Sequence, residues 1–229
     1  MNIAIIAAAG SGNRMASDRP KQFLELGGVP ILLHTIKRFE QCDSIHEVIV
    51  VLPADESAGF LSLAAKSGLR KLSKVVPGGT TRADSVKRGL VAVRSATAEV
   101  VAVHDGVRPF VTPEEIDATV AAASESGAAV LVATVNDTIK EVSDGKIMTT
   151  LERSVLRRAL TPQCFRFAIL QRAFANADIN DPRFTDESAL VEQLGVEVRI
   201  VEGSPQNIKI TTQEDLIMAE AILRSGFQD

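Results

Sequence analysis

The chain has 229 residues, 45% of them hydrophobic and 24% charged, with a formal net charge of −4 and a sequence pI near 5.5. The acidic balance and the absence of Trp and Tyr argue against nucleic-acid binding, and no apolar stretch is long enough to cross a bilayer. Cys42 and Cys164 match neither a paired metal motif nor a disulfide framework, so we expect one globular, cytoplasmic domain over residues 1–229 without nucleic-acid or membrane partners.

Short runs of β-branched residues alternate with segments of helical spacing. Strands are expected at 2–7, 47–52, 74–76, 100–103, 129–134 and 196–201, and helices at 30–39, 57–67, 82–93, 113–124 and 213–224. The first run has no basic segment before it, so we expect a buried strand there and not a signal peptide. Because the strands are continuously apolar, the pattern predicts an α/β, Rossmann-like fold, with a mostly parallel sheet and helices on both faces.

A glycine-rich segment follows the first predicted strand. Residues 7–15 read Ala-Ala-Ala-Gly-Ser-Gly-Asn-Arg-Met, and Lys21 follows shortly after. Small residues let backbone N–H groups approach phosphate oxygens, and Arg14 and Lys21 would neutralise their charge. We therefore interpret the segment as a binding loop for the phosphates of a nucleoside triphosphate. The predicted nucleotide contacts in it are Ala8, Ala9, Gly10 and Gly12.

Other glycine motifs are alternatives for this segment. A Rossmann dinucleotide fingerprint asks for a third small residue where Met15 stands, and it does not ask for the two cations. A Walker P-loop needs Gly-Lys-Ser/Thr after four spacers, which the sequence lacks. The P-loop is excluded, whereas the dinucleotide fingerprint and a plain tight turn remain as alternatives.

The stretch 137–152 departs from the alternation of strands and helices. It contains two short strand-like runs around Ser143-Asp144-Gly145, a sequence typical of hairpin turns. We predict a projecting β-arm there. Because Ile and Val near its tip would be buried most easily against a second copy of the chain, we also predict a homodimer through this arm. A plain surface hairpin is the alternative.

Motifs along the chain carry a family resemblance. They lie at residues 7–15, 20–22, 77–86, 104–109, 137–140, 160–163 and 207–211. In this order, and spanning almost the whole chain, they resemble the 2-C-methyl-D-erythritol 4-phosphate cytidylyltransferase family of the non-mevalonate isoprenoid pathway. The resemblance implies transfer of CMP from CTP to that polyol phosphate, giving 4-(cytidine 5'-diphospho)-2-C-methyl-D-erythritol and pyrophosphate, with Mg²⁺ or another divalent cation as cofactor.

The resemblance also implies roles for individual residues. Arg14 and Lys21 are the predicted catalytic cations, which stabilise charge that builds on the α-phosphate. The further predicted nucleotide contacts are Gly79, Ser85, Asp105 and Gly106. Of these, Gly79 and Ser85 are expected to contact the cytosine base. Asp105 follows an apolar strand, at the sheet edge where such folds bind ligands, and it is also the predicted Mg²⁺ ligand beside the triphosphate. The predicted acceptor contacts are Arg108, Thr138, Arg153, Thr161, Thr185 and Lys209.

Some positions depart from the family pattern, and some functions remain as alternatives. Ala7 stands where proline is common, Gly106 and Val107 replace a usual Ala-Ala, and Thr80 replaces a frequent acidic residue. His104 is expected to be structural, since a strand histidine is usually hydrogen-bonded inside the fold. A ribitol 5-phosphate cytidylyltransferase and a non-catalytic CTP sensor are the alternative functions.

Overall fold

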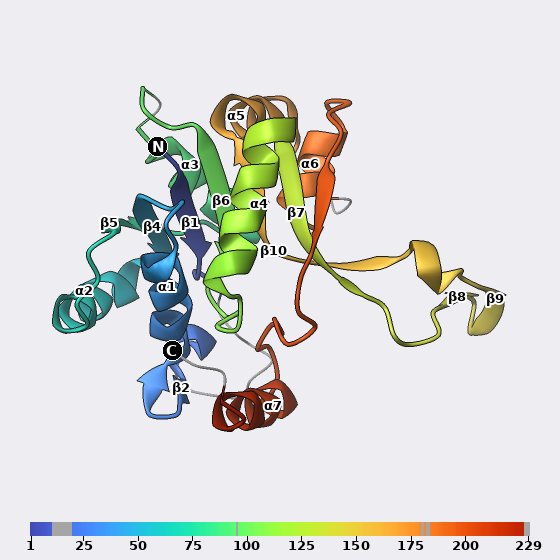
Figure 1. Ribbon diagram of the computed structural model, residues 1–229, viewed down its shortest axis with the longest axis horizontal. Helices are drawn as coiled ribbons and strands as arrows, with labels where there is room; N and C mark the ends of the chain where they lie inside the picture. Colours follow the sequence, from blue (N-terminus) through green and yellow to red (C-terminus); the bar gives the residue numbers. More distant parts are fainter. Residues whose placement is uncertain (11–19, 95, 180, 182–183, 227–229) are drawn as a thin grey trace.

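The computed structural model describes residues 1–10, 20–94, 96–179, 181 and 184–226. Its centre is a seven-stranded sheet in the order β11-β7-β10-β6-β1-β4-β5 (Figure 1). The strands are β1 (Ile3–Ala7), β4 (Glu47–Leu52), β5 (Leu72–Pro77), β6 (Val100–Asp105), β7 (Ala128–Thr134), β10 (Arg157–Arg166) and β11 (Arg199–Glu202). Only β10 pairs antiparallel with its neighbours, so the predicted mostly parallel α/β sheet is confirmed.

Helices cover both faces of the sheet. One face packs against α1 (Ile31–Gln41), α2 (Ser57–Lys66) and α4 (Pro113–Ser126), and the other against α3 (Arg82–Val91), α5 (Phe167–Asn176) and α6 (Glu187–Glu192). Because side chains alternate along a strand, Ala102 of β6 joins the first core and Val103 the second. Helix α7 (Gln213–Arg224) contacts β2 (Glu25–Leu26), which pairs with β3 (Val29–Pro30). In the described part of the chain, no helix is long and apolar enough to span a membrane.

The expected strands and helices all form, and their ends differ from the observed ones by a few residues. Five further strands and helices were not expected, namely β2, β3, β10, α5 and α6. Strand β10 contains Pro162, and a proline argues against a central strand because it cannot donate to the ladder. The pairing of β10 with β7 shifts register between Ala159 and Gln163. This irregularity accommodates the proline inside the sheet.

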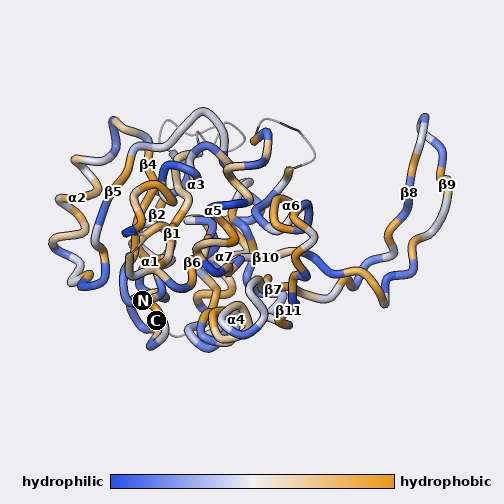
Figure 2. The backbone as a smooth tube through the Cα atoms, turned by 90° about the horizontal axis from the view of Figure 1, so that it is seen from above, coloured by the Kyte–Doolittle hydropathy of each residue, from blue (hydrophilic) through white to orange (hydrophobic). Residues whose placement is uncertain are grey.

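The predicted β-arm is present as a separate hairpin. Strands β8 (Lys140–Ser143) and β9 (Lys146–Thr150) pair with each other and project from the sheet between β7 and β10 (Figures 1 and 2). Asp144 and Gly145 at the turn have φ values of 50° and 73°, the left-handed values that a two-residue hairpin turn requires. Every residue of both strands is exposed. The use of the arm in dimerisation stays a prediction.

Candidate active site

Two loops leave the same edge of the sheet side by side. Ala7 and Asp105, the last residues of β1 and β6, are register partners. Immediately after them, the Gly106 N–H donates to the Ala7 carbonyl at 2.9 Å. A Cβ on Gly106 would lie 2.7 Å from the Ala8 Cβ, so glycine lets the two loops touch. Residues from two distant segments therefore meet at the carboxyl edge, where α/β folds bind ligands.

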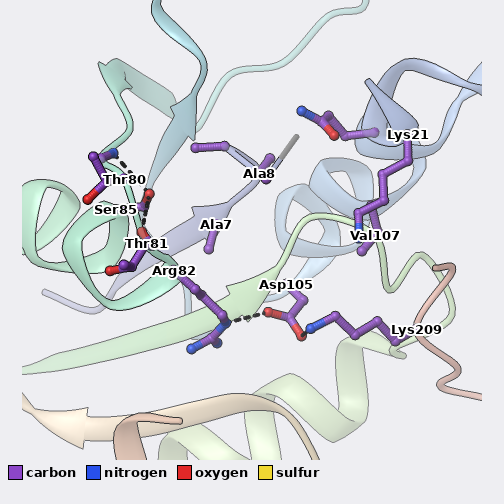
Figure 3. Close-up of a pocket in the computed structure, with 14 residues that line it drawn as sticks. Ala7, Ala8, Lys21, Thr80, Thr81, Arg82, Ser85, Asp105, Val107 and Lys209 are labelled. Atoms are coloured by element: carbon purple, nitrogen blue, oxygen red, sulfur yellow. Dashed lines mark hydrogen bonds and ion pairs between the residues drawn. The ribbon is translucent and has the colours of Figure 1, made fainter. Parts of the chain in front are cut away.

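A pocket of about 450 Å³ opens beside these loops (Figure 3). Its walls come from residues 7–10, from Lys21 and Gln22 of η2 (Lys21–Phe23), from residues 79–82 and Ser85, and from Asp105, Val107 and Lys209. The pocket thus brings together predicted nucleotide and acceptor residues: Ala8, Ala9, Gly10, Lys21, Gly79, Ser85, Asp105 and Lys209. The predicted residues Gly12 and Arg14 lie outside the described residues.

The start of α3 presents a pre-formed hydrogen-bonded turn to this pocket. Thr81 caps the helix by accepting from the Asp84 N–H at 3.0 Å. The Ser85 hydroxyl donates to the Thr81 carbonyl at 2.8 Å and accepts from the Gly79 N–H at 3.0 Å. Because a hydroxyl has one proton, Ser85 retains only acceptor capacity toward a ligand.

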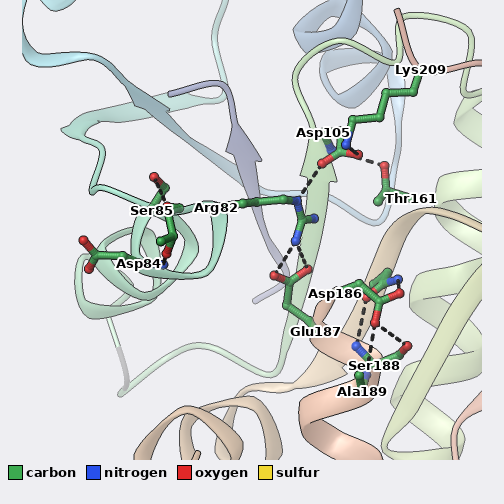
Figure 4. A network of polar contacts seen from close by, with 12 residues as sticks. Arg82, Asp84, Ser85, Asp105, Thr161, Asp186, Glu187, Ser188, Ala189 and Lys209 are labelled. Atoms are coloured by element: carbon green, nitrogen blue, oxygen red, sulfur yellow. Dashed lines mark hydrogen bonds and ion pairs between the residues drawn. The ribbon is translucent and has the colours of Figure 1, made fainter. Parts of the chain in front are cut away.

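Five charged side chains form a network that we call the Asp105 cluster, and Figure 4 shows four of them, Arg82, Asp105, Glu187 and Lys209. Its members are Arg82, Asp105, Arg108, Glu187 and Lys209. Asp105 Oδ1 accepts from Arg82 Nε at 2.9 Å, while Oδ2 lies 3.0 Å from Lys209 Nζ and 3.4 Å from Arg108 Nε. Burial alone would raise the pKa of Asp105, but Arg82, Lys209 and Arg108 outweigh it and hold that pKa far below its ordinary range. The carboxylate therefore stays charged at any pH where the fold operates.

Glu187 anchors the far end of the cluster. It is 1% exposed, and its oxygens lie 2.7 and 2.9 Å from Arg82 Nη1. Burial raises the pKa of Glu187, and the adjacent guanidinium opposes that rise. Burial would likewise lower the pKa of Arg82, but Glu187 and Asp105 outweigh it and raise that pKa, so the guanidinium stays charged. Arg82 thus bridges two carboxylates, one from the sheet edge and one from α6.

His104 sits on the opposite face of β6 and is structural, as expected. Its ring is fully buried and packs edge-on against Phe39 with 5.0 Å between ring centroids. The Thr161 hydroxyl accepts from the Asp105 N–H at 3.2 Å and lies 3.0 Å from His104 Nδ1, while His104 Nε2 lies 3.1 Å from the Arg108 carbonyl. Since a carbonyl only accepts, Nε2 carries the ring proton and Thr161 donates to Nδ1. Burial lowers the pKa of His104 to about 4.

The predicted acceptor residues fall into three places. Arg108, Thr161 and Lys209 surround Asp105, as described above. Thr185 lines a neighbouring pocket of about 250 Å³, whose walls also include Arg82 and Glu187. Thr138 and Arg153 belong to the arm, where Arg153 Nη1 donates to the Asn136 carbonyl at 2.8 Å. The arm projects away from the body that holds the pocket (Figure 2), so these two residues are not brought to this pocket.

The donor set of the pocket fits a metal ion that arrives with a phosphate ligand. Among the described residues, no group of three or more His, Cys, Asp or Glu side chains could hold a metal ion. Asp105 is the one acidic side chain among the described residues that line the pocket. Since Mg²⁺ in phosphate sites is commonly bound through one or two carboxylates plus phosphate oxygens, this set is compatible with it. The role of Asp105 as a metal ligand stays a prediction.

Sequence reasoning did not single out Arg82, Glu187 or Asn207 as functional residues. Arg82 stands in a recognised motif, but its role there depends on Glu187, which comes from a segment more than a hundred positions away. Asn207 is fully buried; its carbonyl accepts from Arg108 Nη1 at 2.8 Å, and its side-chain amide donates to the Thr161 carbonyl at 3.0 Å. The motif at residues 207–211 indicated that this segment belongs to the site, but it did not predict the burial of Asn207 or its hydrogen-bond partners.

The fold and the pocket define a nucleotidyltransferase: a glycine loop, a lysine and a cation-rich cluster meet at the carboxyl edge of an α/β sheet. The family model described as IspD, 2-C-methyl-D-erythritol 4-phosphate cytidylyltransferase, matches residues 2–225. The chain belongs to this family.

Individual relatives and solved structures agree with the family. The chain is 44% identical over 224 residues to the 2-C-methyl-D-erythritol 4-phosphate cytidylyltransferase of Syntrophus aciditrophicus, covering 97% of this chain and 95% of that protein. It is 43% identical over 221 residues to the enzyme of the same name from Bacillus licheniformis, covering 96% and 95%. The crystal structure of 4-diphosphocytidyl-2C-methyl-D-erythritol synthase from Anaerococcus prevotii superposes with a TM-score of 0.86 at 32% identity, covering 97% of this chain and 96% of that one. That of the Thermus thermophilus cytidylyltransferase gives 0.78 at 34% identity, covering 96% and 98%.

Proposed function

We propose that the pocket is divided between two substrates, with CTP on the glycine-loop side and the acceptor phosphate at the Asp105 cluster. The enzyme transfers CMP from CTP to 2-C-methyl-D-erythritol 4-phosphate, giving 4-(cytidine 5'-diphospho)-2-C-methyl-D-erythritol and pyrophosphate for isoprenoid synthesis. The observation that carries the division is that one pocket joins the 7–10 loop and Lys21 to Asp105 and Lys209. Both substrates are polyanions, and this pocket has lysines from two separate segments.

On the CTP side, the roles follow from which groups face the pocket. The Ala8 N–H donates to the Val51 carbonyl at 2.9 Å, so the backbone N–H groups of Ala9 and Gly10 are the ones that approach the phosphates. Lys21, with Arg14 from the segment outside the described residues, stabilises charge on the α-phosphate. Ser85 has acceptor capacity left after its bond to Thr81. A hydroxyl limited to accepting suits the amino group of cytosine and leaves the carbonyl of uracil unpaired. This supports the preference for CTP.

On the acceptor side, Arg108 and Lys209 are the proposed phosphate contacts. Both cations lie against the same oxygen of Asp105, at 3.4 and 3.0 Å, so the carboxylate keeps them side by side before the acceptor arrives. Thr161 supports this wall through the Asp105 N–H. Thr185 lies beyond Arg82, in the adjoining pocket. A phosphate dianion that approaches Asp105 therefore meets two cations that are already in place.

The reaction needs no strong base from the protein. A phosphate monoester with a second pKa near ~6 is mostly dianionic at neutral pH. One of its oxygens attacks the α-phosphorus in line; a new P–O bond forms, and the bond to the β-phosphate oxygen breaks with pyrophosphate carrying away the electron pair. His104, which is buried with both nitrogens hydrogen-bonded, takes no proton in this scheme. Mg²⁺, when bound to the triphosphate beside Asp105, would neutralise charge on the leaving pyrophosphate.

Pyrophosphate release tests this function directly. The purified enzyme is given Mg²⁺ and each of the four nucleoside triphosphates, with 2-C-methyl-D-erythritol 4-phosphate or ribitol 5-phosphate as acceptor. Release is expected only when CTP and the methylerythritol phosphate are both present. If CTP reacts with ribitol 5-phosphate but not with the methylerythritol phosphate, the enzyme is a ribitol 5-phosphate cytidylyltransferase. If UTP reacts at the same rate as CTP, the proposed role of Ser85 is wrong.

We also propose that the β-arm forms a homodimer and completes the partner's acceptor site. Four large apolar side chains of the arm region are well exposed, namely Val142 at 65%, Ile147 and Met148 at 64% and Val155 at 77%. Such a group of exposed apolar residues is typical of an interface. Thr138 and Arg153 lie on this projecting segment, and a second copy of the chain would give them a pocket to reach (Figure 2).

Subunit complementation distinguishes this arrangement from a plain surface hairpin. Lys209→Ala and Arg153→Ala chains are expressed separately and together with different affinity tags. If Lys209 acts within its own subunit and Arg153 in the partner, each mixed dimer holds one intact site, and about a quarter of the sites in a 1:1 mixture recover. Absence of recovery in isolated mixed dimers, or a monomer in sedimentation at micromolar concentration, would contradict the proposal.

A further inference from the structure

The ion pair between Arg82 and Glu187 lies in the site, but the reaction scheme above assigns it no role. We infer that Arg82 and Glu187 are positioning residues for the acceptor phosphate: Glu187 holds Arg82, Arg82 holds one oxygen of Asp105, and the other oxygen is thereby aimed at Lys209 and Arg108. The inference rests on the proposed function, because Lys209 and Arg108 matter here as phosphate contacts. It assigns a function to two residues outside the contact set proposed above.

The division of the Asp105 oxygens carries the inference. Oδ1 accepts from Arg82 at 2.9 Å, and Oδ2 lies against Lys209 (Figure 4). Arg108 lies against the same Oδ2. A carboxylate is planar and rigid, so a donor that fixes one oxygen also fixes the direction of the other. The guanidinium is planar too, and its Nε and Nη1 are used on different partners, Asp105 and Glu187. The orientation of Asp105 therefore depends on where Glu187 holds Arg82.

Glu187 is itself fixed from the sheet. Asp186 caps α6 by accepting from the Ala189 N–H at 3.1 Å, and the Gln163 side chain of β10 donates to Asp186 at 2.8 Å. The Ser188 N–H donates to the same Gln163 side chain at 3.0 Å. These bonds tie the residues on either side of Glu187 to a central strand. Its carboxylate is thus a rigid reference point for Arg82 and not a mobile surface partner.

The charges of the cluster give Glu187 a second effect. Three cations and two carboxylates leave one positive charge in excess (3 − 2 = 1). Arg82 lines the nucleotide pocket, and its side chain is 29% exposed. Without the charge of Glu187, Arg82 would be drawn toward phosphate oxygens and away from Asp105. Glu187 therefore keeps Arg82 from competing with Lys209 and Arg108 for the acceptor.

A purely structural link between α3 and α6 is the competing explanation, and steady-state kinetics separates the two. Glu187→Gln keeps the shape and removes the charge. We expect the KM for the acceptor to rise about tenfold, as for loss of one positioned ionic contact, while the KM for CTP changes less than about twofold. Glu192→Gln on the exposed end of the same helix is the matched control and should leave both constants unchanged. Equal changes in both KM values, or an unchanged acceptor KM in a folded variant, would overturn the inference.

A second pair of variants guards against a folding defect. Arg82→Lys keeps the positive charge but cannot hold two carboxylates through a planar fork, so it should raise the acceptor KM as Glu187→Gln does. In a Lys209→Met background, Glu187→Gln should add little further loss, because its effect runs through Asp105 to Lys209. Fully additive losses would contradict that route. The wild-type enzyme is measured alongside the variants. If the wild-type enzyme does not use the acceptor, the proposed function is wrong; if only the variants behave differently from expectation, the positioning role is wrong.

Discussion

The Asp105 cluster and the β-arm both carry residues predicted to contact the acceptor, yet they are built in opposite ways. In the cluster, the two carboxylates are buried and each charged side chain pairs with another residue of the same chain. On the arm, apolar side chains face outward. The ion pairs of the cluster form within one subunit, whereas no other part of the described chain covers the exposed apolar side chains of the arm. The two regions should therefore respond differently to substitution.

The largest expected effect is on the pocket wall opposite the cluster. Lys21→Ala removes a cation from the proposed α-phosphate site, and kcat should fall on the order of 10² to 10³, as when a fixed electrostatic donor is lost. Lys66→Ala, on an exposed position of α2, is the control. Pyrophosphate release under saturating CTP measures both. A folded Lys21→Ala variant with wild-type turnover would remove Lys21 from the chemistry.

Next, breaking the cluster should destabilise the fold itself. Arg82→Leu leaves the buried Glu187 carboxylate without its partner, and the free energy of unfolding should fall by about 3 kcal/mol. The double variant Arg82→Leu, Glu187→Leu should recover more than half of that loss, because no buried charge is left unpaired. Urea unfolding measures it. Arg199→Leu, which breaks the exposed pair with Glu125, is the control and should change stability by less than about 1 kcal/mol.

The pH dependence of stability tests the neutral state of His104. The folded pKa is lowered to about 4 from an ordinary 6.5, so the unfolded chain binds a proton that the folded chain refuses as pH falls through this window. Well above pH 6.5 the residue is neutral in both states and contributes no pH dependence. Between pH 7 and pH 5 the free energy of unfolding should fall by about 2 kcal/mol through this residue.

A variant comparison isolates that contribution from those of other groups. His104→Gln should start from lower stability at pH 7 but lose less than the wild type on going to pH 5, without nucleotide or metal present. Identical slopes for wild type and His104→Gln would show that His104 is not held neutral by the fold.

The smallest effect on the subunit fold is expected from the arm. Ile147→Asp changes an exposed position, so the free energy of unfolding at low protein concentration should change by less than about 0.5 kcal/mol. Sedimentation velocity should, in contrast, show a shift from dimer to monomer. A large loss of subunit stability with unchanged association would reverse the contrast between the arm and the cluster.

Features that depend on local sequence could be predicted, whereas features that depend on contacts between distant segments could not. Continuous apolar runs predicted the parallel strands, and the turn residues Asp144 and Gly145 predicted the hairpin, because both signals are local. Strand β10 escaped because Pro162 contradicts a central strand unless the register shift is known. Arg82 and Glu187 escaped because their meaning is a contact between distant segments. No local pattern reports which exposed apolar residues find a partner.

Strand β6 places neighbouring side chains on opposite sides of the sheet, and this has a consequence for folding. All six of its residues are buried, so hydropathy does little to distinguish one alignment of the strand from the next. In an alignment shifted by one position, the Asp105 side chain would point to the face of the sheet that holds Phe39, away from its cations. The carboxylate would then be buried without its cationic partners, which is energetically costly, so the ion pairs of Asp105 favour the observed alignment of β6 over the shifted one.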